Sequence, residues 1–542
     1  MKTLIFTATY NEADNIKSLV CDCLAAVPSA DMLVVDDNSP DGTSEILADL
    51  AANLEGRLKL IRRPRKLGLG SAHKLAMKYA LREGYDVLIT MDADYSHHPK
   101  YLRAITDELR NADFVIGSRY AKGGRCDYGL TRQLVSRSAN TLARALLGIP
   151  LRETTTSFRG FKRSLLEQMP VDQIQAEGYA FFFESVLHAT CLARKAAETP
   201  IHFEDRRAGT SKISKKEIMR GVSHLFRLFA ARLTGKLPAG VSHNPDLAED
   251  PCDVCGYSLS TEIYPARNTG HQADTYRCTT AQHGSHGRIA RCLVCGLVAT
   301  NPKLSEDKLN TLYSQVSDDD YIKNIPSRER TFRYNFARIR HLLPAGGALL
   351  DVGSYYGVFL QEARDQGFVA SGVEPSHAAC EFARRRYGAD VLCGTLRDRV
   401  TQKDCDVVTS WDVLEHCYSP SEEVGRVART LRSGGKFAFC TLNWRNWYAR
   451  LLGEKWPWLI DMHLYYFDDD VIEDLLQRHG LKLIHKSTYC HIITGEYFLE
   501  KLRRLRLPLA NTLCSVMKLC PLHRVMLPFR FGDIRMYVAE KT

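Results

Sequence analysis

The chain has 542 residues, a formal net charge of +10 at pH 7, 45% hydrophobic residues and 25% charged residues. This composition excludes a fibrous or disordered chain, and the length exceeds what one hydrophobic core supports, so we expect two to four domains. No run approaches the ~20 apolar residues that span a bilayer, and the opening MKTLIFTATYNE is too short for a signal sequence, so we expect an intracellular, cytoplasmic protein.

The positive charge is concentrated in two segments. Residues 206–236 hold nine Lys and Arg against one Glu, which gives +8, and residues 491–530 hold seven against two Glu, which gives +5. Because the whole chain carries +10, the remainder sums to −3. We therefore expect two basic surfaces that face an anionic partner.

Two regions alternate apolar runs with helical patterns, which predicts α/β folds with mostly parallel sheets. The first region has runs at 3–9, 32–37, 58–62, 86–92 and 113–118, and the second has runs at 348–353, 369–375, 406–411 and 435–441. Pro, Gly and polar residues predict a linker at 236–250, and a weaker break lies at 316–330. The predicted organisation is two separate α/β domains, residues 1–235 and 302–542, joined by this linker and a small cysteine-rich insert, residues 251–301.

Carboxylates follow the strands of the first region. Asp92 and Asp94 come directly after the apolar run LITM, and alternating strand residues face the same way, so both carboxylates can converge just past the strand tip. Ligands of open α/β sheets bind at the carboxyl ends of strands. The pair favours a hard divalent ion, Mg²⁺ or Mn²⁺, that bridges to phosphate oxygens. Zinc bound through His97 and His98 and acids that cap the next helix are the alternatives.

Seven motifs resemble the polyprenol- or dolichol-phosphate mannose synthases, which are inverting family 2 glycosyltransferases with the GT-A fold. They are TYNEADNI, VVDDNSPDGT, KLGLGSAHKLAMKYA, MDADYSHHP, GSRYAKGG, RSANTLARALLG and DRRAGTSKIS, in this order over residues 1 to 230. The resemblance implies transfer of a sugar, mannose from GDP-mannose first among NDP-sugars, to polyprenyl or dolichyl phosphate.

The resemblance also implies the site residues. Asp92, Asp94 and Arg119 would be catalytic, with Mg²⁺ or Mn²⁺ on the two aspartates. The nucleotide-sugar would contact Ala8, Tyr10, Glu12, Val35, Asp37, Asp92, Ala93, Asp94, Arg119, Arg206 and Lys212. The chain has Ala8 where the family usually has proline, and its segment ETTTSFR has Glu153 for Asp and Ser157 for Gly. The alternative is a glycosyltransferase that acts on a non-lipid glycan or a small molecule.

A helical pattern at 214–233 carries apolar residues on one face and Lys and Arg on its flanks. The apolar positions are Ile218, Val222, Leu225, Phe229 and Leu233. The pattern predicts either a helix that packs on its own domain or an interfacial helix on anionic lipid. The second interpretation places the protein peripherally on the inner face of the cytoplasmic membrane.

The insert contains two CxxC pairs, each followed by glycine. Cys252, Cys255, Cys292 and Cys295 have the spacing of a tetrahedral, structural Zn²⁺ site. Cys278, His283 and His286 are alternative ligands. The insert is not notably basic, so we expect no nucleic-acid partner.

The second α/β region resembles class I S-adenosylmethionine (SAM)-dependent methyltransferases, in the subgroup with an N-terminal zinc-binding region, over residues 252 to 542. The motifs are LLDVGSYYGVFL, SGVEPS, DVVTSWDVLEHC and MHLYYFDDDVIEDLLQRHGL. SAM would bind at a glycine-rich turn and a ribose-binding acid, namely Asp351, Gly353, Gly357 and Glu374.

Two positions depart from the methyltransferase pattern. Tyr355 replaces a central glycine, and Thr395 stands where an acid often contacts adenine, so a degenerate methyltransferase is the alternative. His416, beside Glu415, is the one candidate base. The basic segment 491–530 is expected to cap the acceptor site and touch the membrane. The whole chain is thus predicted to be a bifunctional transferase whose methyl acceptor is glycan-related.

Overall fold

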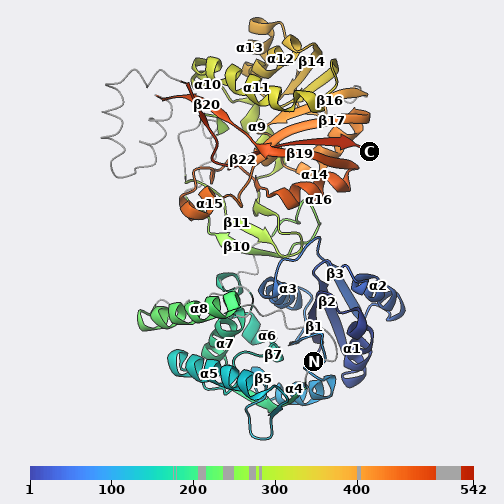
Figure 1. The fold of residues 1–542 in the computed structure, drawn as a ribbon, viewed down its shortest axis with the longest axis vertical. Coiled ribbons are helices and arrows are strands. Elements are labelled where there is room, and N and C mark those ends of the chain that lie inside the picture. Colours follow the sequence, from blue (N-terminus) through green and yellow to red (C-terminus); the bar gives the residue numbers. More distant parts are fainter. Residues whose placement is uncertain are drawn as a thin grey trace. The chain divides into compact units, whose positions relative to one another are not determined.

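The computed structural model describes residues 1–174, 176, 178, 180–204, 215–235, 249–267, 276–279, 284–398, 404–495 and 526–542. Arg206, Lys212, His283, most of the predicted linker and residues 496–525 of the second basic segment lie outside the described residues. The chain divides into two compact units. The first comprises residues 1–249, 257–262 and 292–296, and the second comprises the other residues from 250 onward (Figure 1).

A seven-stranded mixed sheet forms the centre of the N-terminal domain. In spatial order its strands are β3 (Leu58–Arg62), β2 (Ala30–Asp36), β1 (Thr3–Thr9), β4 (Val87–Met91), β7 (Arg159–Lys162), β5 (Phe114–Ser118) and β8 (Ala196–Pro200). Strand β7 runs antiparallel to β4 and β5, and the other pairs are parallel. The predicted apolar runs match β1 to β5 of this sheet. Strand β7, RGFK, is too short and too polar to be found by its pattern.

Helices cover this sheet because each carries an apolar stripe. In α1, Ile16, Leu19, Val20 and Cys23 are fully buried and join a core cluster with Ile5 of β1. The helices are α1 (Ala13–Ala26), α2 (Thr43–Asn53), α3 (Leu69–Arg82), η1 (Pro99–Tyr101), α4 (Leu102–Glu108), α5 (Leu130–Leu147), α6 (Arg163–Leu166), η2 (Val171–Gln173), α7 (Ala180–Leu192) and α8 (Lys215–Leu233). Strands β6 (Arg125–Cys126) and β9 (His202–Phe203) form a separate two-stranded sheet. The helix predicted at 214–233 is confirmed, because the structure has α8 at Lys215–Leu233.

The methyltransferase-like region has its own seven-stranded sheet. The spatial order is β15 (Asp390–Cys393), β14 (Phe368–Glu374), β13 (Gly347–Val352), β16 (Cys405–Trp411), β17 (Leu431–Leu442), β22 (Ile534–Lys541) and β19 (Leu481–Thr488). Strand β22 runs antiparallel to both neighbours. The other elements are α9 (Glu306–Ser314), η4 (Arg340–Leu342), α12 (Val358–Asp365), α13 (His377–Tyr387), η5 (Leu414–His416), α14 (Pro420–Thr430), α15 (Trp447–Leu452), η6 (Gly453–Lys455), α16 (Asp469–Arg478), β20 (His491–Thr494) and β21 (Met526–Phe529).

The break expected at 316–330 is wrong, because this segment forms α10 (Asp319–Lys323) and the start of α11 (Ile325–Ile339). Asp318 caps α10 by accepting the N–H of Tyr321, whose side chain is buried. Pro326 lies in the first turn of α11, where its missing N–H costs no helical hydrogen bond. The acidic residues at the start of α10 and the proline in the first turn of α11 are common at helix starts, but they are also common in loops, and for this reason the segment was predicted to be a break.

The cysteine-containing insert is built on a small sheet of its own. Strands β10 (Ser260–Tyr264), β11 (Ile289–Cys292) and β12 (Val298–Thr300) are followed by β18 (Tyr465–Tyr466), which comes from much later in the chain. The insert thus shares a sheet with the methyltransferase-like region. None of the described helices combines the length and the apolar character that crossing a membrane requires.

Candidate functional sites

Several predicted nucleotide-sugar residues within the described part of the chain lie in or directly after β1, β2 and β4 of the first sheet. Strand β1 pairs with β2 and with β4, so the residues that follow these strands share one edge. Ala8 and Val35 are register partners near the ends of β1 and β2. Tyr10 lies under the Lys66 ammonium, which is 4.2 Å from its ring centroid. The structure thus brings together residues from three separate sequence motifs.

The two carboxylates after β2 are engaged in different ways. Asp36 is fully buried and accepts hydrogen bonds from the hydroxyls of Thr9 and Ser44, which makes it a structural group. Asp37 is ion-paired with the buried Arg63 at 3.0 Å. Burial lowers the pKa of Arg63, and Asp37 opposes that effect by stabilising its charge. Arg63 therefore fixes Asp37 at the edge where the nucleotide is predicted to bind.

Asp92 and Asp94 follow β4 and are held by neighbouring hydroxyls. Ser157 donates a 2.5 Å hydrogen bond to Oδ1 of Asp92, and Ser96 donates a 2.5 Å hydrogen bond to Oδ1 of Asp94. The Asp92 side chain is 38% exposed, so it is open to a ligand. Two adjacent carboxylates with hydroxyl supports suit an oxygen-preferring divalent ion.

The zinc alternative at His97 and His98 is not supported by their hydrogen bonds. Nδ1 of His97 accepts the backbone N–H of Asp92 at 3.1 Å, and its Nε2 lies 2.8 Å from Oγ1 of Thr156. Burial lowers the pKa of His97, which is therefore a neutral ring that donates from Nε2. Nδ1 of His98 accepts the backbone N–H of Lys100. Each ring thus serves a local backbone role.

Arg119 forms a buried bidentate ion pair with Glu153. Its Nε lies 2.7 Å from Oε2 of Glu153, and its second nitrogen lies 2.9 Å from Oε1. Burial acts to lower the pKa of Arg119, but the Glu153 carboxylate outweighs this effect and raises it. The unusual glutamate of ETTTSFR therefore supplies the carboxylate that holds Arg119. The predicted contact of Arg119 with phosphate stays a prediction.

A large cavity of about 1260 Å³ lies at the carboxyl ends of β13, β14 and β16 in the second unit. Predicted SAM residues Asp351, Gly353 and Glu374 line it. Glu374 accepts the backbone N–H groups of Tyr355 and Ser376, each at 2.8 Å. Burial raises the pKa of Glu374 to about 7, against the effect of these two hydrogen bonds. Burial also raises the pKa of Asp351 to about 8.

The glycine-rich turn has backbone angles that explain its residues. Gly353 has φ of 72°, and a Cβ there would lie 2.5 Å from Cγ2 of Val413. Tyr355 has φ of 45°, which lies in the left-handed region; the glycine that the family usually has at this position adopts that region without strain. Its ring packs 4.7 Å from Tyr321 and its hydroxyl lies 3.2 Å from Oδ2 of Asp318. These contacts hold Tyr355 in a backbone conformation that residues other than glycine rarely adopt.

Thr395 and the candidate base His416 also line this cavity. The Thr395 N–H and hydroxyl both donate to Oδ2 of Asp398, at 2.7 and 2.9 Å. His416 is half-buried, and its surroundings lower its pKa to about 4 by desolvation, so the ring is neutral. Beside it lies His463, with the two ring centroids 4.8 Å apart. His463 was not predicted as a site residue, and in the sequence it stands out only as a histidine within the aromatic run MHLYYF.

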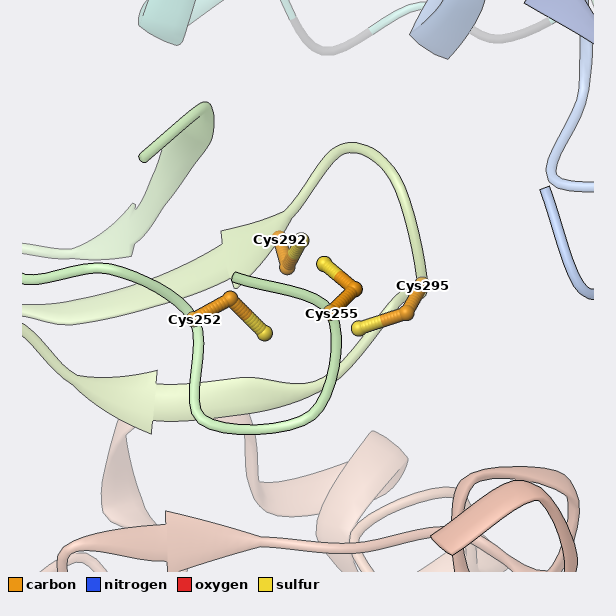
Figure 2. A group of neighbouring side chains, drawn as sticks. All are labelled: Cys252, Cys255, Cys292 and Cys295. Carbon is orange, nitrogen blue, oxygen red and sulfur yellow. The ribbon is translucent and has the colours of Figure 1, made fainter. Parts of the chain in front are cut away.

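The cysteines of the two CxxC pairs converge on one point (Figure 2). Their Sγ atoms, from Cys252, Cys255, Cys292 and Cys295, all lie within 4.8 Å of one another. Thiolates about 2.3 Å from one tetrahedral ion are about 3.8 Å apart, so the group fits a metal ion after small adjustments.

Glycines shape the two cysteine turns. Gly256 and Gly296 have φ of 77° and 83°, and their N–H groups return to the carbonyls of Cys252 and Cys292. Of the alternative ligands, neither Cys278 nor His286 belongs to a metal-binding group within the described residues.

The fold and the paired aspartates define the N-terminal domain as a GT-A glycosyltransferase, and the second sheet with its cavity defines a Rossmann-like methyltransferase. Residues 4–169 match glycosyl transferase family 2, and residues 327–486 match a methyltransferase domain. Through its N-terminal domain the chain belongs to glycosyltransferase family 2. It is therefore an enzyme with two transferase domains, as the sequence predicted.

Two curated relatives align with the N-terminal domain. Polyprenol monophosphomannose synthase of Mycolicibacterium smegmatis is 36% identical over 238 residues, which are 44% of this chain and 89% of that protein. Undecaprenyl-phosphate mannosyltransferase of Micrococcus luteus is 35% identical over 237 residues, which are 43% of this chain and 97% of that protein. A solved SAM-dependent methyltransferase of Thermotoga maritima, described as a possible histamine N-methyltransferase, is 16% identical with a TM-score of 0.29, and covers 41% of this chain and 95% of that one.

Proposed function

We propose that the N-terminal domain transfers mannose from an NDP-mannose donor to the phosphate of a polyprenyl phosphate, and that the C-terminal domain methylates a glycan-related acceptor with SAM. The observation that carries the first half is the alignment over 89% of a polyprenol monophosphomannose synthase. Asp37, Asp92 and Asp94 lie within residues 4–169, the part of the chain that matches glycosyl transferase family 2.

The chemistry fits these residues. A lipid phosphate oxygen would attack C1 of the sugar while the bond from C1 to the diphosphate breaks, so the NDP leaves with the bonding electrons. Bound Mg²⁺ or Mn²⁺, held by Asp92 and Asp94, would neutralise the charge of that leaving group. The phosphate nucleophile is already an anion, so positioning matters more than a strong general base. Arg119, Arg206 and Lys212 are the cations proposed to face the phosphates.

For the methyltransferase, SAM would occupy the cavity lined by Asp351, Gly353 and Glu374. Gly357, with φ of 79°, opens α12 directly behind this turn. The Glu374 carboxylate would accept the ribose hydroxyls. Structural Zn²⁺ would be held by the four cysteine thiolates. The volume of about 1260 Å³ leaves room for an acceptor beside SAM.

A membrane surface is the proposed site of action. Apolar side chains stand exposed on α5 and on α8, two helices that pack against each other. They include Leu130 (80% exposed), Leu134, Val135, Met219, Phe226 and Leu233 (71%). Apolar side chains on basic helices favour insertion among anionic lipid headgroups.

Label transfer tests the glycosyltransferase. The purified chain is incubated with Mn²⁺, polyprenyl phosphate and labelled NDP-sugars, and label extracted into organic solvent is counted. We expect label from GDP-mannose, lost in Asp94→Ala and retained in Asp49→Ala, an exposed aspartate of α2. Lipid label from no donor would reject the proposal in favour of a non-lipid acceptor.

Flotation with vesicles tests the membrane surface. Binding to vesicles rich in anionic lipid should fall in the double variant Leu134→Gln/Phe226→Gln. The control is Val369→Gln, which replaces an apolar side chain of β14 that is 77% exposed. Equal flotation of all three chains would refute the assignment of α5 and α8 to the membrane.

A further inference from the structure

Three polar side chains meet in the methyltransferase cavity without a role in SAM binding. Glu415 and His416 end the short helix η5, and His463 precedes β18. One ligand atom of each residue lies within 4.8 Å of the other two. All three line the cavity of the second unit.

Backbone groups fix the orientation of both imidazole rings. Nδ1 of His416 lies 2.9 Å from the carbonyl oxygen of Met462, and Nδ1 of His463 lies 2.8 Å from that of Trp458. Because a carbonyl can only accept, each Nδ1 carries the proton, and the Tyr313 hydroxyl, 3.1 Å from Nδ1 of His416, can accept from that nitrogen as well. In its neutral form each ring then presents Nε2 as a lone-pair donor. Metal-binding histidines are usually oriented in this way, by an N–H donated to a backbone carbonyl.

The carboxylate is anchored too. The Thr441 hydroxyl donates to Oε2 of Glu415 at 2.8 Å, and the backbone N–H of Leu464 donates to the carbonyl oxygen of Glu415 at 2.8 Å. The second bond ties η5 to the residue that follows His463. The three donor groups are thus held together by the backbone as well as by packing.

We propose that Glu415, His416 and His463 bind a divalent transition-metal ion at the wall of the methyltransferase cavity. Two imidazoles and one carboxylate suit Zn²⁺, Mn²⁺, Fe²⁺ or Co²⁺, and three protein ligands leave coordination positions open. Those positions face the cavity and can take an oxygen atom of the methyl acceptor. Binding of this metal ion can be tested without knowing which sugar the first domain transfers or which acceptor the second domain methylates.

Cobalt binding to the full chain tests this proposal. The Asp94→Ala chain, which lacks a predicted metal ligand of the first domain, is first given one equivalent of Zn²⁺, which the four thiolates bind in preference to the Glu/His site, so that the latter stays open for Co²⁺. Co²⁺ is then added, with equilibrium dialysis for stoichiometry and visible absorption for the ligand type. We expect one equivalent of Co²⁺ without a thiolate charge-transfer band.

Variants assign that equivalent. In His416→Gln or His463→Gln we expect the Co²⁺ affinity to fall at least about 100-fold, and in Thr441→Val about 10-fold, because that change removes only the support of Glu415. His341→Gln, an exposed histidine of the same unit, is the matched control. SAM binding and thermal unfolding show whether each variant is folded. Absence of stoichiometric Co²⁺ binding, or equal affinity in a folded His463→Gln chain, would overturn the proposal.

Discussion

The hydroxyl of Ser157 donates a 2.5 Å hydrogen bond to Oδ1 of Asp92, a predicted metal ligand at the end of β4. Thr156, the preceding residue, lies against Nε2 of His97, whose Nδ1 accepts the backbone N–H of Asp92. Residues 156 and 157 therefore hold both the side chain and the backbone of Asp92. The serine that departs from the family pattern therefore supports Asp92, a residue of the predicted metal site.

Ser157→Ala is expected to weaken metal use by the glycosyltransferase. A hydrogen bond to a charged group contributes about 1.5–3 kcal/mol, so loss of the hydroxyl should raise the Mn²⁺ concentration for half-maximal activity by roughly 10-fold or more. Activity at saturating Mn²⁺ should fall much less, because Asp92 itself remains. Mannosyl transfer as a function of Mn²⁺ concentration measures both quantities. Ser164→Ala, an exposed serine of α6, should change neither, and an unchanged Mn²⁺ dependence of Ser157→Ala would contradict the role assigned to Ser157.

Glu153→Gln is expected to destabilise the N-terminal domain. The change leaves Arg119 buried without its counter-charge, which costs about 3–5 kcal/mol in comparable sites. Urea unfolding followed by circular dichroism measures the loss. The control is Glu167→Gln, which breaks the exposed ion pair with Arg163 and should cost less than about 1 kcal/mol.

A second change separates charge from packing at this pair. The double variant Arg119→Met/Glu153→Leu removes both charges, so it should be more stable than Glu153→Gln alone. It should still lose mannosyl transfer if Arg119 contacts a phosphate. Equal stability of the double variant and Glu153→Gln would show that the buried charge is not the cause.

The fold was largely predictable because its strands are apolar runs of ordinary length. Strands β1 to β5 and strands β13, β14, β16 and β17 follow patterns that are visible along the chain, whereas the four-residue β15 was not predicted. Strand β7 could not be predicted, because its residues RGFK gain their place from pairing with β4 and β5 rather than from their own pattern. Strand β18, only two residues long, joins the insert's sheet for the same reason.

The sites were predicted where one motif carries several ligands, and missed where partners are distant in the chain. One residue separates Asp92 from Asp94, and two residues separate the cysteines of each CxxC pair. Arg119 and Glu153 are 34 residues apart, so nothing local marks them as an ion pair. His463 and His416 are far apart in the sequence, and the hydrogen bond from the Leu464 N–H to the Glu415 carbonyl joins the two segments that carry them. Long-range pairing of this kind is a property of the fold rather than of any sequence window.

Glu374 is expected to make SAM binding depend on pH. Burial raises the pKa of Glu374 to about 7, so below that value the carboxyl is mostly protonated and a weaker acceptor for the ribose hydroxyls. The SAM dissociation constant should therefore fall as the pH rises from about 6 to 7.5, by up to tenfold per pH unit well below the pKa. Calorimetric titration of the full chain over this range measures it.

Glu374→Gln is the matched control for this pH effect. Glutamine accepts the same hydroxyls without titrating, so SAM binding should be weaker at high pH and nearly flat between about pH 6 and 7.5. Asp351, whose pKa burial raises to about 8, should add any remaining dependence at the upper end. A slope that persists unchanged in Glu374→Gln would assign the titration to another group.

The four cysteines predict one tightly held zinc ion whose loss destabilises the insert. Zinc that is bound by four thiolates is released by a mercurial that blocks the thiols, and its binding energy is also folding energy. Cys295→Ser should thus lower the zinc content by one equivalent and lower the melting temperature, whereas Cys191→Ser, an exposed cysteine of α7, should change neither. Metal analysis by mass spectrometry, before and after the mercurial, measures the ion. Cys292 and Cys295 are buried in a turn that closes on Gly296, so without a metal ion their thiolates would repel one another. A zinc-free chain of unchanged stability would therefore contradict this site.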